Sequence, residues 1–122
     1  MLTDPSSIQI ELTPRFKRDL RDLVKRYRQI RSDLQPLIEQ LKAGELPGDR
    51  IAGVNYTVFK VRLKNSNVQK GKRGGYRVIY YLKTPENIIL VTIYSKSDIS
   101  DVDAEVIEEV ISQYEQLQLP DL

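Results

Sequence analysis

Three strand-like segments follow one another closely between residues 57 and 94, and this arrangement limits the fold more than any other feature. Residues 57–64, TVFKVRLK, alternate between apolar and basic side chains, the pattern of a strand with one covered face. Residues 76–82, YRVIYYL, and 88–94, IILVTIY, are apolar enough to be buried strands. Because the connections between them are short, the three strands are expected to form an antiparallel meander.

The segment before the meander predicts a strand followed by a helix. Ile8, Ile10 and Leu12 alternate with polar residues, which indicates a first strand. Thr13 then supplies a helix cap, and Pro14 suits the first helical position because the N–H it lacks would have no partner there. The apolar stripe of this helix, at intervals of three and four residues, is Phe16, Leu20, Leu23, Tyr27 and Ile30.

Two further helices are predicted. The first covers residues 32–43, with Ser32 as its cap, Pro36 in its first turn and Gly44 as its stop. The second begins after Ser100 or Asp101 as the capping residue. Its apolar stripe is Val102, Val106, Ile107, Val110, Ile111, Tyr114 and Leu117.

These elements together predict an α+β fold with the order β-α-α-β-β-β-α, an antiparallel sheet, two helices before the meander and one after it. The 122 residues are expected to form a single domain, residues 1–122, with residues 1–7 as a flexible tail. The order of the elements leaves open where the first strand pairs.

The composition excludes several classes of function. The chain has no cysteine and no histidine, so disulfides, thiolate catalysis and histidine-dependent triads are excluded. The basic and apolar segments of a signal peptide are missing from the N-terminus, and no apolar run is long enough to span a bilayer, so a cytoplasmic protein without membrane contact is expected. No carboxylate pair or metal-ligand cluster accompanies the basic strands, and the GKRGG sequence lacks Walker spacing, so no cofactor or metal is expected.

Charge is distributed unevenly along the chain. Residues 1–96 hold all 19 lysines and arginines against 9 acids, whereas residues 97–122 hold 8 acids and no cation. Residues 51–85 contain eight cations and no carboxylate. A solvated basic surface beside an acidic helix would explain this split, but a surface that binds a polyanion explains it better, because unneutralised cations repel one another.

The basic strand presents its cations on one face. Lys60, Arg62 and Lys64 lie about 6.6 Å apart along a strand, which is close to the spacing of phosphates on an extended nucleic-acid strand. Lys70, Lys72, Arg73 and Arg77 add cations at the start of the next strand. These residues predict a surface that binds RNA by counterion release.

Individual residues within this surface allow two interpretations. In the first interpretation, the Arg77 guanidinium reaches past the sheet edge or pairs with an acid of the last helix. In the second, the planar guanidinium makes two hydrogen bonds to a phosphate. Tyr81, which shares a face with Arg77, and Tyr94, near Lys96, can stack on bases or can simply pack.

The stretches FKVRLK, GGYRVIYYL and IILVTIYSKS, preceded by two amphipathic helices, resemble the RelE/ParE toxin superfamily of bacterial toxin–antitoxin modules. KGKRGGYRVIYY is most similar to the HigB-like branch. The resemblance implies a helix-flanked antiparallel sheet and a toxin that enters the ribosomal A site and cuts messenger RNA. It also implies a cognate antitoxin that wraps around the toxin.

The resemblance assigns roles residue by residue. Lys60 and Arg62 match the family's two basic positions, and Lys64 matches a further cation found in some members. Arg77 matches the arginine thought to contact the scissile phosphate, and Lys96 falls where RelE has an arginine. The catalytic tyrosine of RelE has no match, because the corresponding region here reads DISDVD.

A metal-independent reaction is still possible without histidine. A ribose 2′-hydroxyl would attack the adjacent phosphorus and leave a cyclic phosphate and a 5′-hydroxyl. The expected base is Lys60 or Lys96, because clustered cations favour a neutral lysine, and Arg62, Arg73 and Arg77 would stabilise the transition state. Two alternatives remain open, namely a ParE-like inhibitor of DNA gyrase and a non-catalytic RNA-binding module.

Overall fold

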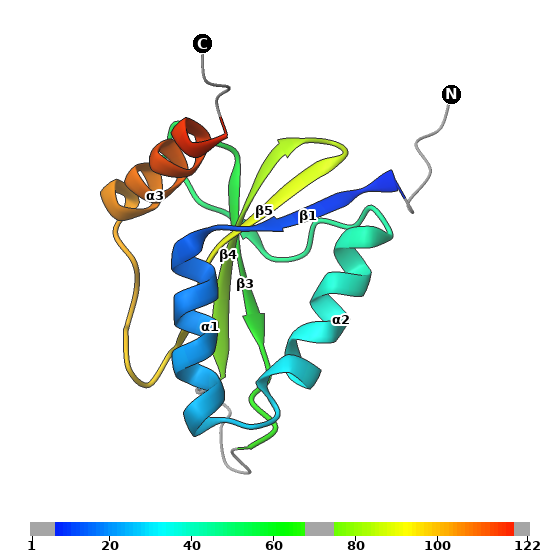
Figure 1. Ribbon diagram of the computed structural model, residues 1–122, viewed down its shortest axis with the longest axis vertical. Coiled ribbons are helices and arrows are strands. Elements are labelled where there is room, and N and C mark those ends of the chain that lie inside the picture. The colour runs from blue at the N-terminus through cyan, green and yellow to red at the C-terminus, as the bar shows by residue number, and fades with distance from the viewer. Residues whose placement is uncertain (1–6, 68–74, 119–122) are drawn as a thin grey trace.

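The computed structural model describes residues 7–67 and 75–118. Helices cover both faces of a single twisted sheet, and the N- and C-terminal ends of the described chain lie at the same end of the molecule (Figure 1). The predicted tail, residues 1–7, lies outside the described residues except for Ser7. The elements are β1 (Gln9–Leu12), α1 (Pro14–Arg26), α2 (Ile30–Lys42), β2 (Asp49–Arg50), β3 (Val58–Leu63), β4 (Tyr76–Thr84), β5 (Asn87–Ser95) and α3 (Ala104–Leu117).

Within residues 7–67 and 75–118, the sheet has five strands in the order β1-β5-β4-β3-β2. The predicted meander is confirmed, since β3 pairs antiparallel with β4 and β4 pairs antiparallel with β5. The expectation of a wholly antiparallel sheet is wrong at one edge, where β1 pairs parallel with β5. This parallel pair is possible because α1, α2 and the first strands of the meander carry the chain back across the sheet between β1 and β5. The short β2 pairs antiparallel with β3 at the other edge of the sheet.

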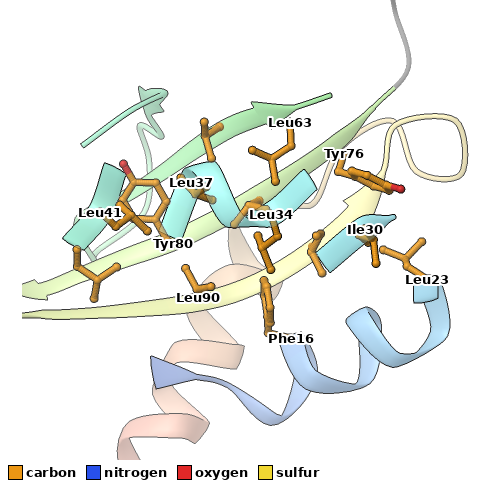
Figure 2. Packing of buried hydrophobic residues seen from close by; sticks show 14 of the residues in the cluster. Phe16, Leu23, Ile30, Leu34, Leu37, Leu41, Leu63, Tyr76, Tyr80 and Leu90 are labelled. Atoms are coloured by element: carbon orange, nitrogen blue, oxygen red, sulfur yellow. The ribbon is translucent and has the colours of Figure 1, made fainter. Parts of the chain in front are cut away.

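The larger core lies between the sheet and helices α1 and α2. Phe16 of α1 and Ile30, Leu37 and Leu41 of α2 are fully buried against the sheet, where Figure 2 shows them facing residues such as Tyr80. A second cluster covers the opposite face. It consists chiefly of Val58, Ile79, Tyr81, Ile89, Val91, Tyr94, Ile107, Ile111 and Tyr114. The sheet is therefore a central layer between α1 and α2 on one side and α3 on the other.

Thr13 joins β1, α1 and β5. Its hydroxyl accepts a hydrogen bond from the N–H of Phe16 at 3.0 Å, as the sequence predicts for a helix cap. The same hydroxyl donates to the carbonyl of Val91 at 2.7 Å, and Thr13 is fully buried. This side chain therefore fixes the start of α1 against the centre of the sheet.

The predicted starts of the other two helices are wrong. Helix α2 begins at Ile30 and is preceded by Gln29, which caps it without a side-chain hydrogen bond, so Ser32 lies inside the helix. Burial of Ile30 draws the first turn onto the core, and Pro36 consequently lies inside the helix rather than in its first turn. Helix α3 begins after Asp103, so that Asp101 belongs to the connection that precedes it.

The end of the last apolar stripe also differs from the prediction. Leu117, predicted to be part of the buried stripe, is 68% exposed at the end of α3. Tyr114, one turn earlier, is buried and donates a hydrogen bond to the carboxylate of Glu11 at 2.6 Å. The packed face of α3 therefore ends at Tyr114.

Gly75 allows β4 to start beside β3. Its φ is +92°, a conformation that costs other residues about 1–2 kcal/mol. A Cβ at this position would lie 2.4 Å from the carbonyl oxygen of Leu63 on β3. The glycine before YRVIYY is therefore required by the backbone, independently of any role in binding.

Candidate functional site

The register of the three central strands places the predicted basic residues on one face. Lys60 and Arg62 alternate with the apolar residues of β3 that pack under α1 and α2, so they face the α3 side of the sheet. Arg62 lies directly opposite Arg77 on β4, and Arg77 lies directly opposite Tyr94 on β5. We call Lys60, Arg62, Arg77 and Tyr94 the cationic face.

Helix α3 covers only part of the α3 side of the sheet. Lys83, near the end of β4, lies 3.8 Å from the carboxylate of Glu115 in the last turns of α3. Arg77 lies at the opposite end of β4, one residue after the strand begins. The cationic face therefore occupies the part of the sheet farther from the end of α3.

Arg77 is unusually buried for an arginine. It is 8% exposed, and its Nη1 donates to the carbonyl of Tyr76 at 3.3 Å. Burial lowers the pKa of Arg77, and the charge of Arg62 lowers it further. Like charges directly opposite each other destabilise a sheet, so Arg62 and Arg77 repel each other across the two strands.

Asp101 is a member of this site that the sequence did not reveal, since it was predicted only as a helix cap. Its Oδ1 accepts hydrogen bonds from Lys60 Nζ at 3.2 Å, from the N–H of Val102 at 2.9 Å and from the Tyr94 hydroxyl at 3.5 Å. The N–H of Val102 lowers the pKa of Asp101, as do Lys60 and Lys96, whereas burial opposes them. The only signal in the sequence was its place in DISDVD, where RelE has its tyrosine.

Lys96 holds the connection between β5 and α3 in place. Its N–H donates to the carbonyl of Gly75 at 3.0 Å, and its Nζ donates to the carbonyl of Ser100. Its charge contributes to the lowered pKa of Asp101. Lys96 therefore lies beside the cationic face, at the start of the connection that carries Asp101.

The two tyrosines predicted to bind RNA are both buried. Tyr94 is 4% exposed, and burial, followed by the charge of Asp101, raises its pKa, so at neutral pH it is a hydrogen-bond donor. Tyr81 packs under α3 and contacts Tyr56 edge to face, with ring centroids 5.2 Å apart. In this structure neither ring presents a face on which a base could stack.

The remaining predicted residues are not brought into the cluster. Lys64 follows the end of β3 and is exposed, with no ion pair to any residue that the structure describes. Lys70, Lys72 and Arg73 lie outside the described residues. The cluster thus consists of Lys60, Arg62, Arg77, Tyr94, Lys96 and Asp101.

A hollow of about 530 Å³ lies away from the cationic face, between α1 and α3. Arg15 and Arg18 line one side of it, and Val106, Val110 and Tyr114 line the other. A smaller hollow of about 230 Å³ borders Tyr94 and runs under the Arg26–Asp98 ion pair. Lys60, Arg62 and Arg77 line neither of these two hollows.

Within residues 7–67 and 75–118, no group of three or more acids could hold a metal ion. In the same part of the chain, no helix has both the length and the hydropathy needed to cross a bilayer.

In the part of the chain that the structure describes, three helices around a five-stranded mixed sheet, with cations on one sheet face, form an α+β fold consistent with RelE-like toxins. A family model described as the ParE toxin of the type II toxin–antitoxin system parDE matches residues 10–99 of the 122. The chain therefore belongs to the ParE toxin family, within the RelE/ParE superfamily. It is a toxin of a type II toxin–antitoxin module, and its family implies a cognate antitoxin as partner.

Proposed function

We propose that this toxin is an endoribonuclease that cuts messenger RNA in the ribosomal A site and so inhibits translation. The observation that carries the proposal is the direct pairing of Arg62 with Arg77 on the cationic face. Two guanidinium groups on adjacent strands suit the two free oxygens of a phosphodiester. The resemblance of the same residues to the RelE and HigB-like positions supports this assignment.

The chemistry requires no metal. The ribose 2′-oxygen forms a bond to phosphorus while the bond from phosphorus to the 5′-oxygen breaks, which leaves a 2′,3′-cyclic phosphate and a 5′-hydroxyl. Negative charge grows on the non-bridging oxygens as the phosphorane forms. The sheet fixes the backbone of Arg62 opposite that of Arg77, so both guanidinium groups can reach one phosphate and stabilise that charge.

Lys60 fits an electrostatic role better than the role of base. In this structure its ammonium donates a hydrogen bond to Asp101, whereas a base must accept a proton. The positive charge of Lys60 lies two residues from Arg62 on the same face, where it adds to the attraction for the RNA backbone.

One observation favours the alternative of a gyrase inhibitor. The matching family model carries the ParE description, and the ParE-like alternative is a protein that blocks DNA gyrase. In that case the cationic face would bind an acidic protein surface or DNA, and no RNA product would form. A non-catalytic RNA-binding module would likewise bind RNA in a salt-sensitive manner and leave it intact.

The test uses purified toxin with translating ribosomes, with free messenger RNA and with gyrase in a supercoiling assay. We expect cleavage only on ribosomes. Loss of one hydrogen-bond donor that stabilises a transition state typically costs about 2.7–4 kcal/mol. Arg77→Ala, and Arg62→Ala at an exposed position, should therefore each slow cleavage about 10²–10³-fold.

Lys83→Ala is the matched control, because it removes one cation from the same strand, outside the cationic face. It should cleave at the wild-type rate. Inhibition of supercoiling without any RNA product would overturn the proposal in favour of the gyrase alternative. RNA binding without cleavage would overturn it in favour of the binding module.

A further inference from the structure

The side chain of Asp101 is held from one side only. All three hydrogen bonds given to it, from Lys60, Tyr94 and Val102, end on Oδ1. In the described part of the chain, Oδ2 has no hydrogen-bond donor. The side chain is 64% exposed, so a fixed carboxylate presents one free oxygen to the solvent.

The donors that hold Asp101 also place it beside the arginine pair. Tyr94, which donates to Asp101, lies directly opposite Arg77 in the sheet register. Lys60, which also donates to it, lies two residues from Arg62 on the same face of β3. The carboxylate therefore lies on the same side of the sheet as the Arg62–Arg77 pair, linked to it through Lys60 and Tyr94.

A carboxylate in this position fills a gap in the proposed chemistry. The arginines can stabilise the phosphorane, but neither can accept a proton, because a guanidinium stays charged. Tyr94 keeps its proton at neutral pH, since burial raises its pKa. Asp101, whose pKa is lowered, stays ionised and can accept a proton.

We propose that Asp101 is the general base of this toxin and that its free Oδ2 takes the proton of the ribose 2′-hydroxyl. The inference rests on the proposed nuclease function and deepens it. The 2′-oxygen then bonds to phosphorus, the 5′-oxygen leaves with the electron pair of its bond and takes a proton from water, and Asp101 returns its proton to solvent. Lys60 and Tyr94 are positioning residues that fix Oδ1.

Asp101→Asn is the decisive variant, because the amide oxygen can still accept from Lys60, Tyr94 and Val102 while the group can no longer act as a base. Asp98→Asn is its control, since Asp98 lies in the same connection but pairs with Arg26. We expect Asp101→Asn to slow cleavage on programmed ribosomes about 10²–10⁴-fold, with ribosome binding unchanged and Asp98→Asn near the wild-type rate.

Two further readouts distinguish a base from a merely structural residue. The titratable groups facing Asp101 in the described structure are Lys60, Tyr94 and Lys96, and the pKa of Asp101 itself is lowered, so its carboxylate stays ionised near neutral pH. Cleavage by the wild type should therefore vary little with pH there, whereas the residual rate of Asp101→Asn should rise in proportion to hydroxide. Formate should restore cleavage to Asp101→Ala but not to Arg77→Ala.

The outcomes separate the two proposals. If Asp101→Asn cuts as fast as the wild type or faster while Arg77→Ala is inactive, the nuclease proposal stands and Asp101 is only a counterion for Lys60. If the wild type cuts no RNA on ribosomes, the proposed function fails, and the assignment of the base is overturned with it.

Discussion

Thr13 offers a direct test of how the fold is held together. Replacing it with valine keeps the shape of the side chain but removes both hydrogen bonds of the hydroxyl, to Phe16 and to Val91. Loss of the helix cap costs about 1 kcal/mol. A buried carbonyl left without its donor, here that of Val91, costs about 1–3 kcal/mol more. The expected loss is therefore about 2–4 kcal/mol, a large part of the total stability of a domain of this size.

The assay is urea unfolding followed by circular dichroism. With a slope of about 1.5 kcal/mol per molar urea, the midpoint of Thr13→Val should fall by roughly 1.3–2.7 M. Thr13→Ser is the matched control, because it keeps the hydroxyl and loses one methyl group, worth about 1 kcal/mol. Equal midpoints for the valine and serine variants would refute the reasoning, since the hydroxyl would then contribute nothing.

Two further predictions concern the sheet and its tyrosines. Gly75→Ala should lower stability more than Gly44→Ala, as measured by thermal unfolding. Both glycines have positive φ, but of the two only Gly75 has a backbone oxygen 2.4 Å from the position of the added Cβ. Equal losses of stability would show that this close approach does not matter. Burial raises the pKa of Tyr80 and of Tyr94, and it raises the pKa of Tyr114 to about 12. The stability that these protonated phenols contribute is therefore complete below the ordinary tyrosine pKa of about 10. It is lost as the pH rises through the pKa of each phenol in the folded protein. Absorbance at alkaline pH should therefore show these phenols ionising late, together with unfolding, and ionisation near pH 10 in a folded protein would contradict their burial.

The spacing of apolar residues predicted most of the helices and strands, because it reflects which face of each helix or strand is buried. The alternation in β3 placed Phe59, Val61 and Leu63 toward the core and Lys60 and Arg62 away from it, as the structure confirms. The parallel pairing of β1 with β5 could not be predicted in this way, because it joins residues about 78 positions apart and depends on the packing of everything between them.

The site was predicted only where it depends on strand alternation. The common face of Lys60 and Arg62 followed from alternation along one strand, and the structure adds that Arg77 lies opposite Arg62. Asp101 could not be found, because it is brought to Lys60 by the path of an irregular connection that has no period of its own. Burial of Tyr81 under α3 was equally hidden, since the direction of that helix is a tertiary property.

The pairing of β1 with β5 has a consequence for synthesis of the toxin. Residues 87–95 must leave the exit tunnel before the N-terminal strand can find its neighbour, and contacts between such distant parts of a chain form slowly. Tyr94 belongs to the same strand, and Lys96 and Asp101 are translated after it, so a nascent chain cannot assemble the cluster around Arg62 and Arg77 before these residues have emerged. The cluster around Arg62 and Arg77 therefore forms only after residue 101 has left the ribosome, and any activity that depends on the cluster can begin no earlier.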